Sequence, residues 1–184
     1  MIKTLRIGII LFIFDLAMMP LMCHSEKNEQ ISFYGALVNE PCSLSPGVTG
    51  SDMTVDFGTI PEKNFYLSQS GYAWSAKFSI QLENCDLSIG NQVKLTFNGD
   101  EDKEQSGMLA LESKSQISHV AIDITTSDGK RIPINTSSDV FSLNSGGVTL
   151  SFIAHLKASA AGIIQKNIGN GSFESSATFT LEYL

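Results

Sequence analysis

Apolar and polar residues alternate along most of the chain after position 30, which is the period of a strand with one buried face. No stretch with a helical period is long enough to predict a helix of useful length. The positions that carry the alternation are Ile31, Phe33, Gly35 and Leu37; Met53, Val55 and Phe57; Phe78, Ile80 and Leu82; Val93, Leu95 and Phe97; Val120, Ile122 and Ile124; Ile132 and Ile134; Leu150, Phe152 and Leu156; and Phe173, Ala177, Phe179, Leu181 and Tyr183.

Polar and glycine-rich stretches separate these segments. Residues 43–52, 100–107 and 135–147 are rich in Gly, Ser, Asn and Asp and are expected to form loops. The tetrapeptide Ser-Asp-Gly-Lys at 127–130 predicts a tight hairpin into a returning strand at 132–134, because Asp-Gly adopts positive φ at little cost. Several short strands separated by turns, within one domain, predict an all-β sandwich whose two inner faces form the core.

The start of the chain has the composition of an export signal. Two basic residues precede the apolar stretch Ile7–Met22, which is too short and too interrupted for a membrane-spanning anchor. Small residues before Ser25 are compatible with cleavage after it, so residues 1–25 are predicted to be a removed signal peptide. Lipid attachment at Cys23 is the alternative. The rest of the chain is long enough for one ordinary domain with its own core.

Charge and cysteine content narrow the possible partners. The net charge of −7 argues against nucleic acid or anionic lipid as a partner. After export, Cys42 and Cys85 remain in an oxidising compartment, where such a pair normally forms a disulfide. Closing that loop stabilises the fold by about 4 kcal/mol in the chain-entropy model. Metal ligation is the competing interpretation, but there is no Cys-x-x-Cys and the His residues are scattered.

The sequence contains no legible catalytic constellation. It lacks Gly-x-Ser-x-Gly, Gly-x-Gly-x-x-Gly and His-Glu-x-x-His, so we expect neither an enzyme nor a cofactor or metal. The acidic run Asp100–Asp102 is compatible with calcium binding or with a solvated surface. Trp74 beside Tyr72 is compatible with a sugar-stacking platform or with ordinary packing. His155 is out of phase with the apolar positions and is expected on a strand surface.

Several motifs in order along the chain suggest a family. The alternating segment Ile31–Cys42 contains a glycine and closes on the first Cys of the predicted disulfide. Residues 55–60 read Val-x-Phe-Gly-x-Ile, and residues 78–85 read Phe-x-Ile-x-Leu-x-x-Cys. Gly171 is fourteenth from the end, and Tyr183 is the penultimate residue. Together these motifs resemble the pilus subunits of the chaperone/usher pathway, of the type 1 pilin kind.

This resemblance implies an incomplete immunoglobulin-like β-sandwich that a donor strand from another subunit completes, the strand-addition case known for pilins. The implied boundaries are a donor-strand extension at 26–41 and a pilin domain at 42–184. The implied donor side chains are Ile31, Phe33 and Leu37, with Gly35 allowing close approach. Ser175 is a polar departure from the pattern. The implied acceptor and chaperone-contacting residues are Gly171, Phe173, Ala177, Phe179, Leu181, Tyr183 and Leu184, the last through its carboxylate.

By the same resemblance the chain is expected to be a structural fimbrial subunit, exported through the periplasm to the cell-surface fimbrium, that contributes to cell adhesion. Its implied partners are a periplasmic chaperone, an outer-membrane usher and neighbouring pilin subunits. The alternatives are a self-contained secreted sandwich that binds carbohydrate or protein, a tip adhesin and a periplasmic enzyme. An antibody-like domain places Tyr two positions before its second Cys, where this chain has Glu83.

Overall fold

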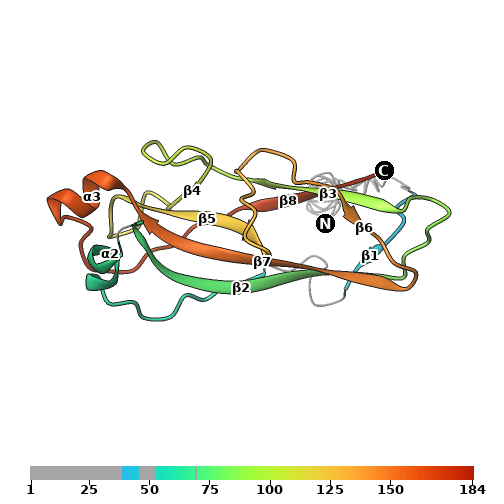
Figure 1. Cartoon of the computed structure of the whole chain (residues 1–184), viewed down its shortest axis with the longest axis horizontal. Helices are drawn as coiled ribbons and strands as arrows, with labels where there is room; N and C mark the ends of the chain where they lie inside the picture. The colour runs from blue at the N-terminus through green and yellow to red at the C-terminus, as the bar shows by residue number, and fades with distance from the viewer. Residues whose placement is uncertain (1–38, 46–52, 69) are drawn as a thin grey trace, which may run out of the picture. The chain divides into compact units, whose positions relative to one another are not determined.

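Two antiparallel sheets form the framework of the chain in a computed structural model, which describes residues 39–45, 53–68 and 70–184 (Figure 1). Within these residues, one sheet has five strands in the order β1-β2-β7-β5-β4, and the other has three in the order β6-β3-β8. The predicted all-β sandwich is confirmed. The strands are β1 (Ser43–Leu44), β2 (Tyr72–Glu83), β3 (Gln92–Asn98), β4 (Leu109–Ala110), β5 (Val120–Thr126), β6 (Phe141–Ser142), β7 (Gly147–Ala158) and β8 (Thr178–Tyr183).

Strands β2 and β7 form the central ladder of the five-stranded sheet. Phe78 lies opposite Phe152, and Ile80 lies opposite Leu150, so the two alternations are in register and give one apolar face. The Phe152 side chain is almost fully buried, and its ring centroid lies 5.3 Å from that of Phe97 on β3 of the other sheet. The two inner faces therefore meet in one core, as the alternation predicts.

Strand β5 is buried on both faces, although its alternation predicts only one buried face. Ile122 and Ile124 pack into the core, while Asp123 is also only 1% exposed. The Asp123 carboxylate accepts hydrogen bonds from the Tyr72 hydroxyl and from Nε of Arg131, both at 2.6 Å. Burial, followed by the hydrogen bond to Asp123, raises the pKa of Tyr72 to about 12. This polar cluster fastens β2 and the segment after β5 to the outer face of β5.

The predicted hairpin after β5 forms, but its returning segment is not a regular strand. Gly129 adopts a φ of 88°, and its amide donates back to the end of β5. Ile132 then donates to β5 at 2.8 Å, whereas Ile134 donates to the Gly107 carbonyl at 3.0 Å. Pro133 lies between them and has no amide hydrogen, so the ladder cannot continue. The predicted strand at 132–134 is therefore wrong, although both isoleucines belong to the core.

Two short helices among the described residues, α2 (Lys63–Leu67) and α3 (Ala160–Gln165), lie at the same end of the sheets (Figure 1). In α3 the Ser159 hydroxyl caps the first turn by accepting from the Gly162 amide at 3.2 Å, and the helix ends at Lys166 in a left-handed conformation. Neither helix was expected, because five or six residues are too few to show a helical period. No helix in the described part of the chain has the length and apolar character needed to cross a membrane.

A disulfide joins Cys42, just before β1, to Cys85, just after β2, across a sequence separation of 43 residues. Both cysteines are buried. The bond ties the first described segment to the end of a central strand, and the Asp86 amide next to it donates to the Pro41 carbonyl at 2.8 Å. This end of the sandwich is therefore held by both covalent and backbone links.

The buried Asp123 cluster makes a specific contribution to stability. Replacing Asp123 with Ala leaves the Tyr72 hydroxyl and the Arg131 guanidinium without their shared acceptor, which we expect to cost about 2–3 kcal/mol of unfolding free energy. Urea denaturation measures this change. Asp139→Ala is the matched control, because it removes an exposed carboxylate that pairs with Lys130 at the surface. Equal denaturation midpoints for the two variants would contradict the importance assigned to the cluster.

Candidate functional site: an apolar groove beside residues 53–60 and 171–177

The segment at residues 53–60 runs beside the core without joining a sheet. The alternation predicts a strand at Met53–Phe57, yet no residue from 53 to 60 is in a strand. None of them forms a backbone–backbone hydrogen bond with another described residue. A local bond from the Gly58 amide to the Asp56 carboxylate, at 2.7 Å, shapes the turn instead. Val55 and Phe57 nevertheless pack against the core, so the side chains follow the predicted pattern while the backbone groups stay unpaired within the described chain.

Among the described residues, the segment 171–177 finds backbone partners along one side only. The carbonyl of Ser172 accepts from the Gln116 amide at 2.9 Å, and the carbonyl of Glu174 accepts from the Glu112 amide at 2.8 Å. The backbone groups of successive residues in an extended chain point alternately to its two sides. The N–H and C=O groups of Phe173 and Ser175 therefore point away from the side on which Ser172 and Glu174 are paired. Neither Phe173 nor Ser175 forms a backbone hydrogen bond with a described residue. This segment leads into β8, which pairs with β3 and lies at the edge of its sheet.

A groove lies between these two segments. Its larger hollow has a volume of about 790 Å³, and the sheets contribute the apolar floor. A second hollow of about 550 Å³ adjoins it and shares Val55, Phe57 and Phe173 as lining residues. The floor of the larger hollow includes Phe78, Ile80, Phe97, Leu109, Ile122 and Ile124. The groove therefore exposes part of the hydrophobic core that a further strand would otherwise cover.

The side chains along the groove are only partly buried, although they belong to the core. Phe173, Phe179 and Leu181 pack against the buried cluster and remain partly exposed. Phe57 and Phe173 approach across the groove with ring centroids 6.0 Å apart, a separation typical of interacting aromatic pairs. These rings narrow the groove between its two hollows.

Gly171 begins the paired segment at a position that no other residue fits. Its φ is +146°, and a Cβ atom built there would overlap the Gln116 side chain. The Gln116 carboxamide oxygen occupies that space and accepts from the Ser172 amide at 3.1 Å. The Ser115 hydroxyl also accepts from the Glu174 amide at 3.1 Å. Sequence reasoning singled out Gly171 but missed Gln116 and Ser115, because nothing local distinguishes them from other polar loop residues.

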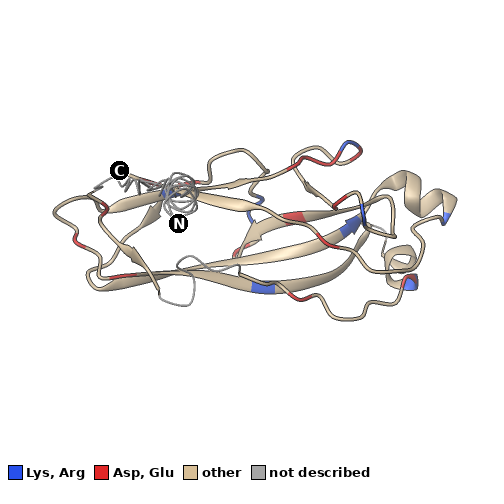
Figure 2. Cartoon of the chain, turned by 180° about the vertical axis from the view of Figure 1, so that it is seen from behind, with Lys and Arg blue, Asp and Glu red and all other residues tan. Residues whose placement is uncertain are grey.

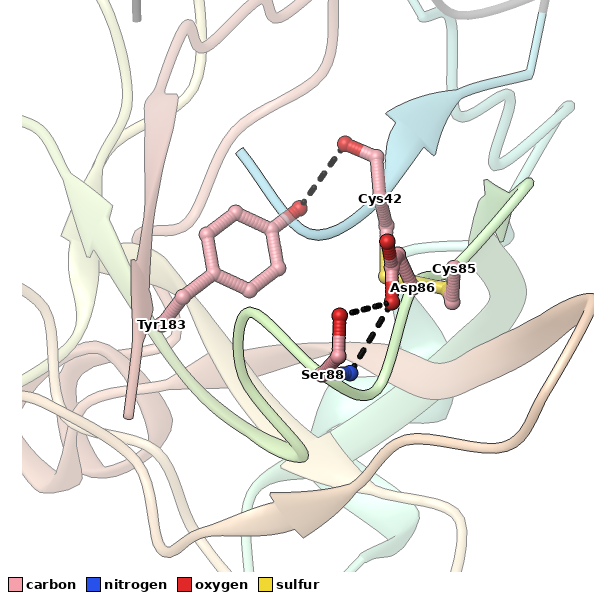
Figure 3. Close-up of a disulfide and its surroundings, with 5 residues drawn as sticks. All are labelled: Cys42, Cys85, Asp86, Ser88 and Tyr183. Atoms are coloured by element: carbon pink, nitrogen blue, oxygen red, sulfur yellow. Dashed lines mark hydrogen bonds between the residues drawn. A yellow bond between two sulfur atoms is a disulfide. The ribbon is translucent and has the colours of Figure 1, made fainter. Parts of the chain in front are cut away.

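The other end of the groove wall lies beside the disulfide (Figure 3). The Tyr183 ring points toward the Cys42 segment, and its hydroxyl donates to the Cys42 carbonyl at 3.5 Å. Burial, with a smaller effect from the Glu40 carboxylate, raises the pKa of Tyr183. Leu184 continues the pairing with the start of β3, since its amide donates to the Gln92 carbonyl at 2.9 Å.

All of the expected acceptor residues thus follow one wall of the groove or its extension, from Gly171 to Leu184. The four expected donor positions Ile31, Phe33, Gly35 and Leu37 lie outside the described residues.

The other candidate sites from the sequence have structural roles. A bulge separates Tyr72 from Trp74, and the two residues pair with Lys157 and Leu156 respectively, which lie on opposite faces of β7. They therefore do not form one stacking platform. In the acidic run, the carboxylate of Asp102 accepts two loop amides. Glu101 accepts from the Gly107 amide, and this bond, more than its other contacts, lowers the pKa of the Glu101 carboxyl.

Gly171 provides a test of how the groove wall is positioned. We expect Gly171→Ala to lower the unfolding free energy by about 2–3 kcal/mol, because the new methyl group overlaps Gln116 and the backbone is strained. Gly146→Ala is the control. Gly146 also has a positive φ, but nothing lies within 4 Å of its built Cβ, so only the backbone strain applies. Chemical denaturation of both variants measures the difference, and an equal loss would show that the contact with Gln116 is unimportant.

Comparison with known proteins agrees with this geometry. The family model described as fimbrial protein matches residues 31–184. The chain is 33% identical over 154 residues to the major MR/P fimbria protein of Proteus mirabilis (strain HI4320), covering 83% of this chain and 82% of that protein. It is 30% identical over 154 residues to the fimbria A protein of Serratia marcescens, covering 84% and 83% respectively.

Solved structures show the same fold. The P pilus rod subunit PapA superposes with a TM-score of 0.65 at 25% identity, over 79% of this chain and all of that one. A subunit from the structure of a chaperone–usher pilus superposes with a TM-score of 0.66 at 25% identity, over 86% of this chain and 97% of that one. The predicted resemblance to pilins and the immunoglobulin-like fold are confirmed. The chain belongs to the fimbrial protein family, and it is a structural, non-enzymatic subunit of a pilus on the bacterial cell surface.

Proposed function

We propose that this subunit polymerises by donor-strand complementation, with residues 26–41 of one pilin subunit filling the groove of its neighbour. The observation that carries the proposal is the pair of segments 53–60 and 171–177, which flank an apolar groove and carry backbone groups without backbone partners among the described residues. An inserted strand would supply hydrogen bonds to the backbone and apolar side chains to the floor in one step.

The donor segment has the period that such a groove requires. Ile31, Phe33, Gly35 and Leu37 lie on alternate positions and so face one side of an extended strand. Seven extended residues span about 23 Å, and the acceptor segment 171–177 has the same number of residues. Burying each large apolar side chain contributes about 1.5–3 kcal/mol before the entropy of ordering is subtracted. Gly35 suits the place where Phe57 and Phe173 narrow the groove.

Before a neighbouring subunit binds, another protein must occupy the groove, because an exposed apolar surface beside an unpaired strand edge promotes aggregation. We assign this role to a periplasmic chaperone, with an outer-membrane usher receiving the complex. The similarity to a subunit of a chaperone–usher pilus supports this assignment. Leu184 is 48% exposed next to the edge strand, a position in which its carboxylate is accessible to basic residues of the chaperone.

The division of the chain follows from the same proposal. Residues 1–25 are a signal peptide that is removed, residues 26–41 are the donor extension, and residues 42–184 are the pilin domain that carries the groove. The assembled fimbria contributes to cell adhesion. A self-contained binding module is the competing function, and it requires a sandwich whose groove needs no second chain.

A peptide of residues 26–41 distinguishes these functions. We expect it to displace the chaperone from a purified chaperone–subunit complex and to leave a soluble, protease-resistant subunit, because it fills the groove. The same peptide with Phe33→Ser is the control and should fail, since one large apolar anchor is missing. Size-exclusion chromatography follows the exchange. A subunit that is stable as a monomer when produced alone, and that binds neither peptide, would favour the self-contained module.

Capture by the chaperone provides a second test. Tyr183 is half-buried at the end of β8, which continues the groove wall beyond the two hollows, whereas Trp74 is 49% exposed on β2. We expect Tyr183→Ser to reduce the yield of chaperone-bound subunit several-fold and Trp74→Ala to change it little. Co-purification on a tagged chaperone measures both. Undiminished capture of the Tyr183 variant would refute the assignment of this wall as the chaperone-binding strand.

A further inference from the structure

Large apolar side chains are exposed at both ends of the described sandwich. The most exposed are Ile164 on α3 and Leu67 on α2, at 81% and 77%. We call the part of the surface formed by α2 and α3 the helix end. Beside the Cys42–Cys85 disulfide, Leu87 and Ile89 are 40% and 43% exposed. We call that part, residues 39–42 and 85–91, the disulfide end.

The two ends also differ in charge. Lys63 and Lys166 lie at the helix end, where Figure 2 shows basic positions on or next to both helices. Two carboxylates lie at this end: Glu62 accepts a hydrogen bond from Tyr66, and Glu104 pairs with His119 beside Ser159, the cap of α3. The disulfide end carries Glu40 and Asp86. Hydrogen bonds from Ser88 lower the pKa of the Asp86 carboxyl, so it stays ionised well below neutral pH. Both ends are therefore apolar, and Lys63 and Lys166 of the helix end are opposite in charge to Glu40 and Asp86 of the disulfide end.

The direction of an inserted donor strand decides which end of the donor subunit lies next to which end of the acceptor subunit. Every ladder in the described sheets is antiparallel, and antiparallel pairing is slightly the more stable. A donor that runs antiparallel to 171–183 finishes next to residue 171. That is the side of the helix end, because the second hollow is lined by Phe65 of α2 together with Gly169–Gly171.

The segment that links the donor strand to the pilin domain of the same subunit is short. Leu37, the last donor position, is five residues from Cys42, so the two are at most about 17 Å apart. The disulfide end of the donor subunit must therefore lie close to the helix end of the acceptor. A tether of this length gives an effective concentration in the millimolar range or above, so even a small contact surface is populated.

We propose that the helix end of each subunit docks on the disulfide end of the next copy, in a head-to-tail contact separate from the groove. This inference rests on the proposed donor-strand assembly. Leu67 and Ile164 pack against Leu87 and Ile89, and Lys63 and Lys166 face Glu40 and Asp86. The contact joins two different surfaces, so it repeats along an open filament instead of closing a dimer. It adds to the stability of the fibre and limits bending between subunits.

The apolar part is tested on fibres assembled in cells from the full chain. Leu67→Ser combined with Ile164→Ser should make fibres dissociate in urea about 5–30-fold faster, the factor expected for one or two lost kcal/mol. Both side chains are highly exposed, so the variant subunit should fold and should bind the 26–41 peptide with unchanged affinity. That peptide measurement separates a loss of docking from damage to the groove.

The charged part is tested by exchange of partners. Lys166→Glu alone and Asp86→Lys alone should each speed dissociation about 2–5-fold, as for other surface ion pairs, and the two together should restore the wild-type rate. Lys130→Glu, on the hairpin away from both ends, is the control and should have no effect. Wild-type dissociation rates for all these variants, with peptide binding intact, would overturn the docking proposal and leave donor-strand assembly standing. Failure of the wild-type groove to bind the peptide would overturn both.

Discussion

An apolar groove flanked by unpaired backbone is the feature on which the rest of this structure depends. Extended backbone whose N–H and C=O groups lack partners is a template for pairing with another chain, and an exposed core invites aggregation. In the described residues both conditions occur together along segments 53–60 and 171–177. A strand from another polypeptide removes both at once, so folding and assembly become one process. A surface loop or a ligand could cover the apolar floor, but only an extended chain also satisfies the two rows of backbone groups.

The remainder of the fold holds the groove open. The β2–β7 ladder and the buried β5 give a rigid floor, and the Asp123 cluster fastens the outer face of that floor. The disulfide and Tyr183 fix one end of the groove wall, while Gly171 and Gln116 fix the other. The stabilising contacts thus lie beside the groove, where a wall segment without them would collapse onto the exposed core.

Much of this was predictable from the sequence, and what was missed has clear physical reasons. Alternation placed Ile80, Phe97 and Ile124 in the core, since the side-chain period of a strand depends only on local geometry. The same alternation predicted a strand at 53–57, where the side chains follow the pattern but the described chain offers no pairing partner. Pairing is a tertiary property that periodicity does not report. The role of Gln116 was equally hidden, because it depends on a contact across 55 positions of sequence with Gly171.

Amide hydrogen exchange at Phe173 and Ser175 tests the central claim most directly. In a subunit that lacks residues 26–38, these two amides should exchange rapidly, and a bound 26–41 peptide should slow them by at least about 100-fold, because each becomes paired with the inserted strand. The Ala121 amide, in the sheet interior, serves as the reference and should be protected in both states. Equal exchange at Phe173 and Ser175 with and without the peptide would contradict the account, since the groove would then not be the place where a second chain completes the sandwich.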